Sequence, residues 1–213
     1  MDIADSLSFV VLGVMGYRLV GGLRHARSTG GRDIVRRIVR GIRWRHVWPI
    51  PFVLAAILAV AWPLMSVPGL DWGWWSAIGG EGNPVFGSSS ATTGSVLEWV
   101  IPLVFMALLL PALPLFAYAE ERAFRRGAER WSLPKRAVKV VQFGLVHALI
   151  GIPIGAALAL SVGGAYFMAV YLRHVRTHAS PGEATLESAS AHTAYNMAII
   201  AVVLLALALG AVS

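Results

Sequence analysis

Long, predominantly apolar stretches limit what this chain can fold into. Four of them cover residues 6–23, 47–67, 97–119 and 188–212. A helix needs about 20 predominantly apolar residues to cross a hydrocarbon core of about 30 Å, so we expect each stretch to be a membrane-spanning helix. Hydrophobic residues make up 57% of the chain and charged residues only 14%, which is too apolar for a water-soluble domain. We expect residues 1–213 to form a single membrane domain.

A further apolar region, residues 137–172, is interrupted at 151–155 by the sequence GIPIG. Gly and Pro together favour a turn between two helices. The first of these helices, 137–152, would be about 24 Å long at 1.5 Å per residue, so whether it spans fully stays open. The expected fold is all-α: a polytopic membrane helix bundle of about six transmembrane spans plus a cytoplasmic interfacial helix.

The charged residues indicate how such a bundle is oriented. All 18 Lys and Arg lie in 18–45, in 122–139, or at Arg173 and Arg176. The other polar connections carry acids and no base, namely Asp2, Asp5, Asp71, Glu81 and Glu98. Cytoplasmic loops are enriched in Lys and Arg, so we expect a multi-pass plasma-membrane protein with its N-terminus outside and its basic loops in the cytoplasm. The same distribution accounts for the net charge of +7, so we expect no nucleic-acid partner.

The segment 32–46, RDIVRRIVRGIRWRH, alternates basic and apolar residues at helical spacing. This pattern is typical of a helix that lies in the membrane interface. We therefore expect membrane lipids as partners, with anionic headgroups contacting its arginines: Arg32, Arg36, Arg37, Arg40 and Arg43.

The exterior connection, 68–96, begins with three tryptophans and continues with a Gly/Ser/Thr tract. Tryptophans are enriched where membrane spans meet water. We expect Trp72, Trp74 and Trp75 to belong to such an aromatic belt.

Ionisable and polar groups at or within the apolar helices are the candidate functional residues, because each is costly to bury without a partner. Glu120 and Glu121 end the third long stretch, and two further pairs occur in later ones: Phe143 with His147, and His192 with Asn196. Residues four apart share a helix face, so His192 and Asn196 should point in one direction. By the same spacing Glu121 should pair with Arg125, which leaves Glu120 available for another role.

Each of these groups also has a purely structural interpretation. A glutamate pair next to arginines can form an interfacial salt-bridge cluster, and an intramembrane His or Asn can hydrogen-bond neighbouring helices. The chain has no cysteine, and His174 and His178 lack a carboxylate at a fixed spacing, so we expect no metal and no cofactor. His25 and His46 fall in the basic segment and receive no role.

Three motifs in order, E-E-x-x-x-R at 120–125, F-x-x-x-H at 143–147 and H-x-x-x-N at 192–196, resemble those of the CPBP family of intramembrane glutamic endopeptidases. This family includes the CAAX prenyl-protein proteases and bacteriocin-processing proteins. The resemblance covers about residues 115–205, which would form the catalytic core. Residues 1–114 would supply the N-terminal spans, the basic interfacial helix and the exterior loop.

The resemblance implies roles for seven residues. Glu120 and His147 would activate the hydrolytic water, and His192 and Asn196 would stabilise the oxyanion. Glu121, Arg125 and Phe143 would support them. The implied activity is cleavage of a membrane-associated peptide near the cytoplasmic leaflet, without a metal.

Two other classes of function compete with this hypothesis. The first is a catalytically silent subunit of a larger membrane complex such as a transporter, whose partners would be membrane proteins. Arg126 favours it, because the family commonly has Gly directly after the motif arginine. The second, a small transporter or channel, has little support, because no inverted repeat is visible. The Arg-rich, Lys-poor composition suggests a GC-rich bacterial genome and hence a substrate other than a prenylated protein.

Overall fold

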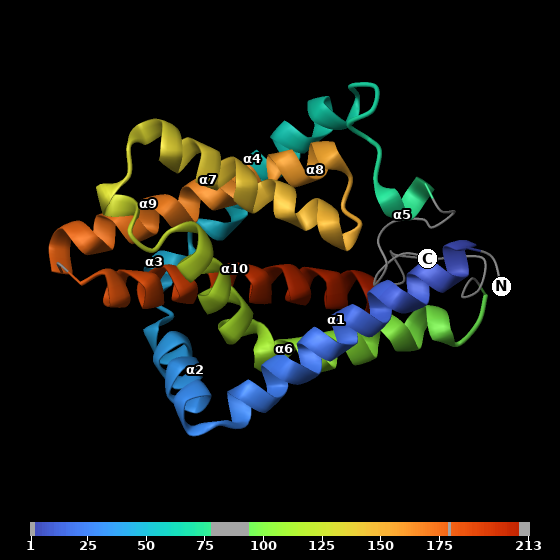
Figure 1. The fold of residues 1–213 in the computed structure, drawn as a ribbon, viewed down its shortest axis with the longest axis horizontal. Helices are drawn as coiled ribbons and strands as arrows, with labels where there is room; N and C mark the ends of the chain where they lie inside the picture. The colour runs from blue at the N-terminus through green and yellow to red at the C-terminus, as the bar shows by residue number, and fades with distance from the viewer. Residues whose placement is uncertain (1–2, 78–93, 179, 209–213) are drawn as a thin grey trace.

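The computed structural model describes residues 3–77, 94–178 and 180–208. Within these residues every regular element is a helix and no strand forms, so the all-α prediction is confirmed (Figure 1). The elements in chain order are α1 (Ile3–Arg27), α2 (Thr29–Gly41), α3 (Trp44–Val47), α4 (Ile50–Met65), α5 (Trp74–Ala77), α6 (Leu97–Phe124), the 3-10 helix η1 (Ala128–Arg130), α7 (Leu133–Leu145), the 3-10 helix η2 (Val146–Ile150), α8 (Ile154–Ala159), α9 (Ser161–His178) and α10 (Pro181–Ala208).

Four helical segments in the described part of the chain are long and apolar enough to cross a membrane. They are Trp44–Met65, Val100–Arg130, Ile154–Thr177 and Pro181–Leu205. They include or overlap the stretches expected at 47–67, 97–119 and 188–212 and the second part of the region 137–172. This agrees with a membrane protein.

The count of about six spans is not confirmed. The helix α1 does cover residues 6–23, but it is not among the four candidate spans. The helix α7 has 13 residues and is therefore about 20 Å long, shorter than a hydrocarbon core. The expected turn at 151–155 does form: Gly151 has φ 90°, and α8 begins after Pro153. A left-handed φ of this kind is readily adopted by glycine.

The last long helix, α10, lies at the centre of the fold (Figure 1). It packs against α9 on one side and α6 on the other, and its first half also contacts α2 and α3. Every residue from 188 to 195 is buried, which means that more than two full turns are enclosed on all sides. Buried polar groups are usually hydrogen-bonded, and Ser188, Ser190 and His192 in this stretch do bond residues of other helices, whereas the Thr193 hydroxyl has no partner among the described residues.

The segment predicted as one helix over 32–46 is divided in two. The helix α2 begins earlier, where Ser28 Oγ accepts a hydrogen bond from the Gly31 N–H at 3.1 Å. It ends at Gly41, and Ile42 and Arg43 are extended before α3. A Cβ at Gly41 would lie 2.6 Å from Ser190 Oγ, so glycine permits the close approach of α2 to α10.

The apolar face of α2 packs against protein. Ile38 is fully buried, and its carbonyl oxygen accepts a hydrogen bond from Ser190 Oγ at 2.9 Å. An interfacial position for this helix is therefore not confirmed. The arginines predicted to meet lipid headgroups are all exposed: Arg32, Arg36, Arg37, Arg40 and Arg43.

The connection after α4 is hydrogen-bonded through its backbone to the turn at 151–155. The Gly155 N–H donates to the Leu70 carbonyl oxygen at 2.7 Å, and the Ile154 N–H donates to that of Trp72 at 3.1 Å. Trp72 is exposed, as an aromatic belt requires, but Trp75 is buried, so its assignment to the belt was wrong. The Gly/Ser/Thr tract lies largely in 78–93, outside the described residues.

Candidate active site

Glu121 is the centre of a buried polar network between α6 and α10. Its side chain has 0% exposure. Oε1 accepts hydrogen bonds from Arg125 Nη1 and from His192 Nδ1, both at 2.9 Å. Oε2 accepts a third from Ser188 Oγ. The predicted pair of Glu121 and Arg125 is thus confirmed. Both oxygens of this carboxylate accept hydrogen bonds from protein groups, and neither is exposed to solvent.

Arg125 occupies the C-terminal end of α6 and is also fully buried. Its guanidinium carbon lies 3.9 Å from the ring centre of Phe143, and Nη2 donates to the Gly164 carbonyl oxygen at 3.4 Å. Burial of a charge is costly unless it is paired and hydrogen-bonded. The carboxylate of Glu121 and the face of Phe143 supply that compensation.

His192 is held by two aromatic rings and one carboxylate. It stacks on Phe167 with ring centres 4.3 Å apart and meets Phe143 edge-on at 5.6 Å. Because a carboxylate only accepts hydrogen bonds, Nδ1 carries the proton in the bond to Glu121. The second ring nitrogen, Nε2, then faces Glu120, with 3.8 Å between Nε2 and Glu120 Oε2.

Glu120 differs from its neighbour in having an uncommitted oxygen. Its side chain is 36% exposed, yet Oε2 itself is buried and has no hydrogen-bond partner among the described residues. The 3.8 Å to His192 Nε2 is too long for a direct hydrogen bond. The prediction that Glu120 is left available once Glu121 pairs with Arg125 is consistent with this geometry.

His147 does not contact Glu120. It lies in η2, where Nδ1 donates to the Phe143 carbonyl oxygen at 2.8 Å. Its ring centre is 5.2 Å from that of Phe143, which also contacts His192 with ring centres 5.6 Å apart. The expected pairing of Glu120 with His147 is therefore replaced by proximity of Glu120 to His192. The hydrogen bond through Nδ1 leaves Nε2 of His147 as the nitrogen open to other partners.

Asn196 follows His192 by one helical turn on α10, as its spacing predicts, and is half-buried. No hydrogen bond joins its side chain to another described residue. It is therefore a donor group on the face of α10 that also carries His192.

Sequence reasoning missed two members of the site. Ser188 lies four residues before His192, so helical spacing was a signal that could have identified it. Its hydroxyl also bonds the Phe167 carbonyl oxygen at 3.0 Å and so ties α10 to α9. Phe167 had no such signal, because its contact with His192 is between separate helices.

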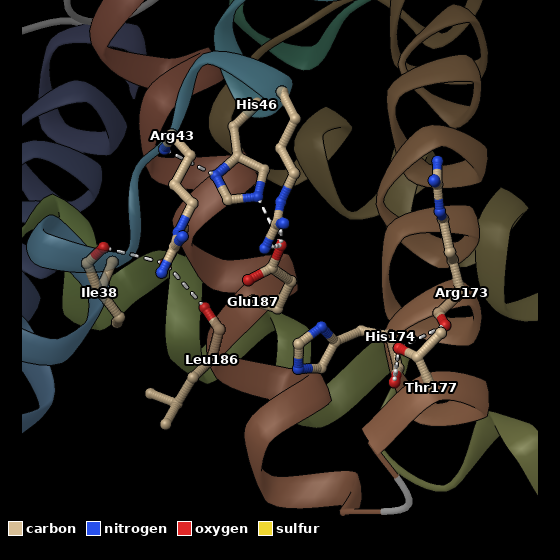
Figure 2. Close-up of polar contacts among 10 residues, drawn as sticks. Ile38, Arg43, His46, Arg173, His174, Thr177, Leu186 and Glu187 are labelled. Atoms are coloured by element: carbon tan, nitrogen blue, oxygen red, sulfur yellow. Dashed lines mark hydrogen bonds and ion pairs between the residues drawn. The ribbon is translucent and has the colours of Figure 1, made fainter.

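A second polar cluster, also missed, lies near the start of α10 (Figure 2). His46 is almost fully buried, accepts a hydrogen bond from the Arg43 N–H at Nδ1, and donates from Nε2 to Glu187 Oε1 at 2.7 Å. Arg45 Nη2 lies 2.7 Å from the same oxygen. His46, which received no role from the sequence, is therefore a structural link between α3 and α10.

Within the described ranges, no three His, Cys, Asp or Glu side chains are grouped so that they could hold a metal ion. Comparison with known proteins gives no relative: no family model, no curated protein and no solved structure matches this chain. Chemically, the site offers one uncommitted carboxylate oxygen, one imidazole of fixed orientation and a supporting network in which both oxygens of Glu121 accept hydrogen bonds, whereas Arg125 Nε has no partner among the described residues.

Proposed function

We propose that this chain is an intramembrane endopeptidase that cleaves a membrane-associated peptide with a water activated by Glu120. The observation that carries the proposal is the buried, unpartnered Oε2 of Glu120, 3.8 Å from His192 Nε2. A water molecule that donates to Glu120 Oε2 and also hydrogen-bonds His192 Nε2 fits this separation, because each hydrogen bond needs about 2.8 Å.

The reaction proceeds in two steps. The Glu120 carboxylate removes a proton from water as the water oxygen attacks the peptide carbonyl carbon. The resulting oxyanion accepts a hydrogen bond from the Asn196 amide and, when both ring nitrogens of His192 carry a proton, a second from its Nε2–H. Collapse of the tetrahedral intermediate breaks the C–N bond, and the proton on Glu120 passes to the leaving nitrogen. His147 remains a further proton carrier next to Phe143.

The supporting network explains why His192 would act at a fixed position. Its Nδ1 is bound to a carboxylate that two other groups also hold, so the ring has one orientation. A general acid or oxyanion donor is most effective when its position is set before the substrate arrives. The resemblance of the three motifs to those of the CPBP family supports the same reaction class.

The position of the site supports a substrate at the membrane surface. Glu120 lies near the basic end of the candidate span Val100–Arg130, which also carries Arg122, Arg125, Arg126 and Arg130. If basic ends face the cytoplasm of a bacterial cell, the scissile bond lies near the inner leaflet.

A direct test uses the purified chain in liposomes with a library of N-myristoylated peptides, with products identified by mass spectrometry. Glu120→Gln should lower cleavage by about 10²- to 10⁴-fold, the usual contribution of a general base. Glu183→Gln is the matched control, since it removes an exposed carboxylate of α10 bound to Arg37. Equal cleavage by wild type and Glu120→Gln would refute the proposal.

One observation favours a second candidate, a catalytically silent subunit of a larger membrane complex. Arg125 and Ser188 each hydrogen-bond Glu121, and the bond from Ser188 joins α10 to α6, so the network also serves as a link between helices. Extraction in mild detergent followed by mass analysis separates the candidates. Stoichiometric recovery with other membrane proteins, together with no cleavage by the wild type, would favour the subunit.

A further inference from the structure

A cavity of about 510 Å³ lies on the side of α9 away from the candidate active site. Its walls come from α3 and the start of α4, from one face of α9, and from Glu187 on α10. None of the residues proposed for catalysis lines it. It therefore needs an explanation of its own.

All three walls belong to the ends of candidate membrane spans. Trp48 is in the first turns of Trp44–Met65, Arg173 is in the last turns of Ile154–Thr177, and Glu187 is in the second turn of Pro181–Leu205. The cavity is therefore at the level where the bundle leaves the hydrocarbon core. The half-exposed ring of Trp48 agrees with this position, because tryptophan is enriched at membrane interfaces.

The wall on α9 changes from apolar to basic along the helix. Ala169 and Val170 line the deeper part, and Arg173 and His174 follow one turn nearer the end. Figure 2 shows the ring of His174 projecting toward Glu187 on α10. A surface that is apolar toward the membrane centre and basic toward water is complementary to an amphiphile with an anionic headgroup.

The charges in the cavity leave an excess of positive charge. Two arginines, Arg45 and Arg173, line it against the single carboxylate of Glu187. That carboxylate is already bound by Arg45 and His46 at 2.7 Å each, so its repulsion of an anion is reduced. Arg173 is exposed and forms no ion pair with another described residue.

An adjoining cavity of about 390 Å³ shares Arg45, His174 and Glu187 and extends toward α2. It adds Arg37 and Arg43 against Glu183, so the positive excess continues in this direction. The two cavities together have the size of an ordinary ligand pocket.

We infer that these cavities bind one anionic glycerophospholipid, whose phosphate lies at Arg173 and whose first acyl carbons lie against Trp48 and Val170. This is a defined binding site, distinct from general attraction of headgroups to the exposed face of α2. The basic lining selects against a zwitterionic lipid, and the apolar wall selects against a free phosphate.

The test is native mass spectrometry of the full chain in a neutral detergent, titrated with phosphatidylglycerol or phosphatidylcholine. We expect one phosphatidylglycerol to remain bound at concentrations where phosphatidylcholine does not. Arg173→Gln should weaken binding about tenfold, the effect of losing one charge-assisted hydrogen bond. Ala169→Trp, which places a ring from an exposed position into the cavity, should weaken it similarly.

Two matched variants separate a defined site from general surface charge. Arg176→Gln and Ala165→Trp change exposed positions of α9 that do not line the cavity, so neither should alter affinity. Equal weakening by Arg176→Gln and Arg173→Gln, or equal retention of the two lipids, would overturn the inference. Displacement of the lipid by glycerol phosphate at similar concentration would also overturn it, because the ligand would then be a soluble anion.

Discussion

His192 Nδ1 on α10 donates a hydrogen bond to Glu121 Oε1 on α6 at 2.9 Å. This bond distinguishes two adjacent glutamates that look equivalent in the sequence. Both oxygens of Glu121 are used in joining helices, whereas Oε2 of Glu120 has no hydrogen-bond partner in the described part of the chain. We therefore expect substitution of Glu121 to lower stability and substitution of Glu120 to lower activity.

Glu121→Gln should destabilise the protein strongly, and Glu120→Gln should not. Removing the charge of Glu121 leaves Arg125 buried without its counter-ion, which costs about 3–5 kcal/mol. Glu120→Gln removes no hydrogen bond and should change stability by about 0.5 kcal/mol or less. Thermal unfolding in detergent measures both. Similar unfolding midpoints for the two variants would contradict the central position of Glu121 in the network.

Arg125→Met should destabilise more when made alone than when combined with Glu121→Gln. The single variant leaves a buried carboxylate uncompensated, at a cost of about 3–5 kcal/mol, whereas the double variant removes both charges. Unfolding midpoints of both variants test this, with the exposed Arg126→Met as control. Strictly additive effects would argue against coupling between the two residues.

Ser188→Ala should destabilise the protein by about 1.5–3 kcal/mol, because its hydroxyl donates to a buried charged group. Ser161→Ala is the matched control, since its buried hydroxyl has no hydrogen-bond partner among the described residues. Chemical denaturation of the two variants side by side is the measurement. An equal loss in both would mean that the bond to Glu121 contributes nothing specific.

Gly164→Ala and Gly163→Ala should have opposite effects. A Cβ at Gly164 would lie 2.8 Å from Phe143 Cδ1, so Phe143 must shift, at a cost of about 1–3 kcal/mol. At Gly163 the nearest atom is Ile57 Cδ1 at 3.5 Å, and alanine should stabilise the helix by up to about 1 kcal/mol. Unfolding midpoints compare them, and cleavage assays report whether the shift of Phe143 reaches His192.

The sequence was sufficient for features that depend on spacing within one helix. The pair of Glu121 and Arg125 follows from i,i+4 geometry. The end of one helix and the start of another around Gly151 follow from backbone preferences. The lengths of the apolar stretches, together with the composition, predicted an all-α chain with several apolar helices.

Features that depend on how separate helices are oriented relative to one another could not be predicted from the sequence. Nothing in the sequence determines that Phe143 contacts His192 as well as His147, or that Phe167 stacks on His192. Amphipathic periodicity in 32–46 correctly indicated an apolar face, but the same pattern fits lipid and protein. The contact between Ile38 and Ser190 shows that protein covers the apolar face at this point.

Glu187 and Ser188 are consecutive residues of α10, and they point into different clusters: one binds His46 and Arg45, the other Glu121. Adjacent positions on a helix differ by about 100° around the axis. A small rotation or axial slide of α10 would therefore strain both clusters at the same moment. If a ligand in the basic cavity moves α10, the imidazole beside Glu120 moves with it, because both clusters are attached to the same helix.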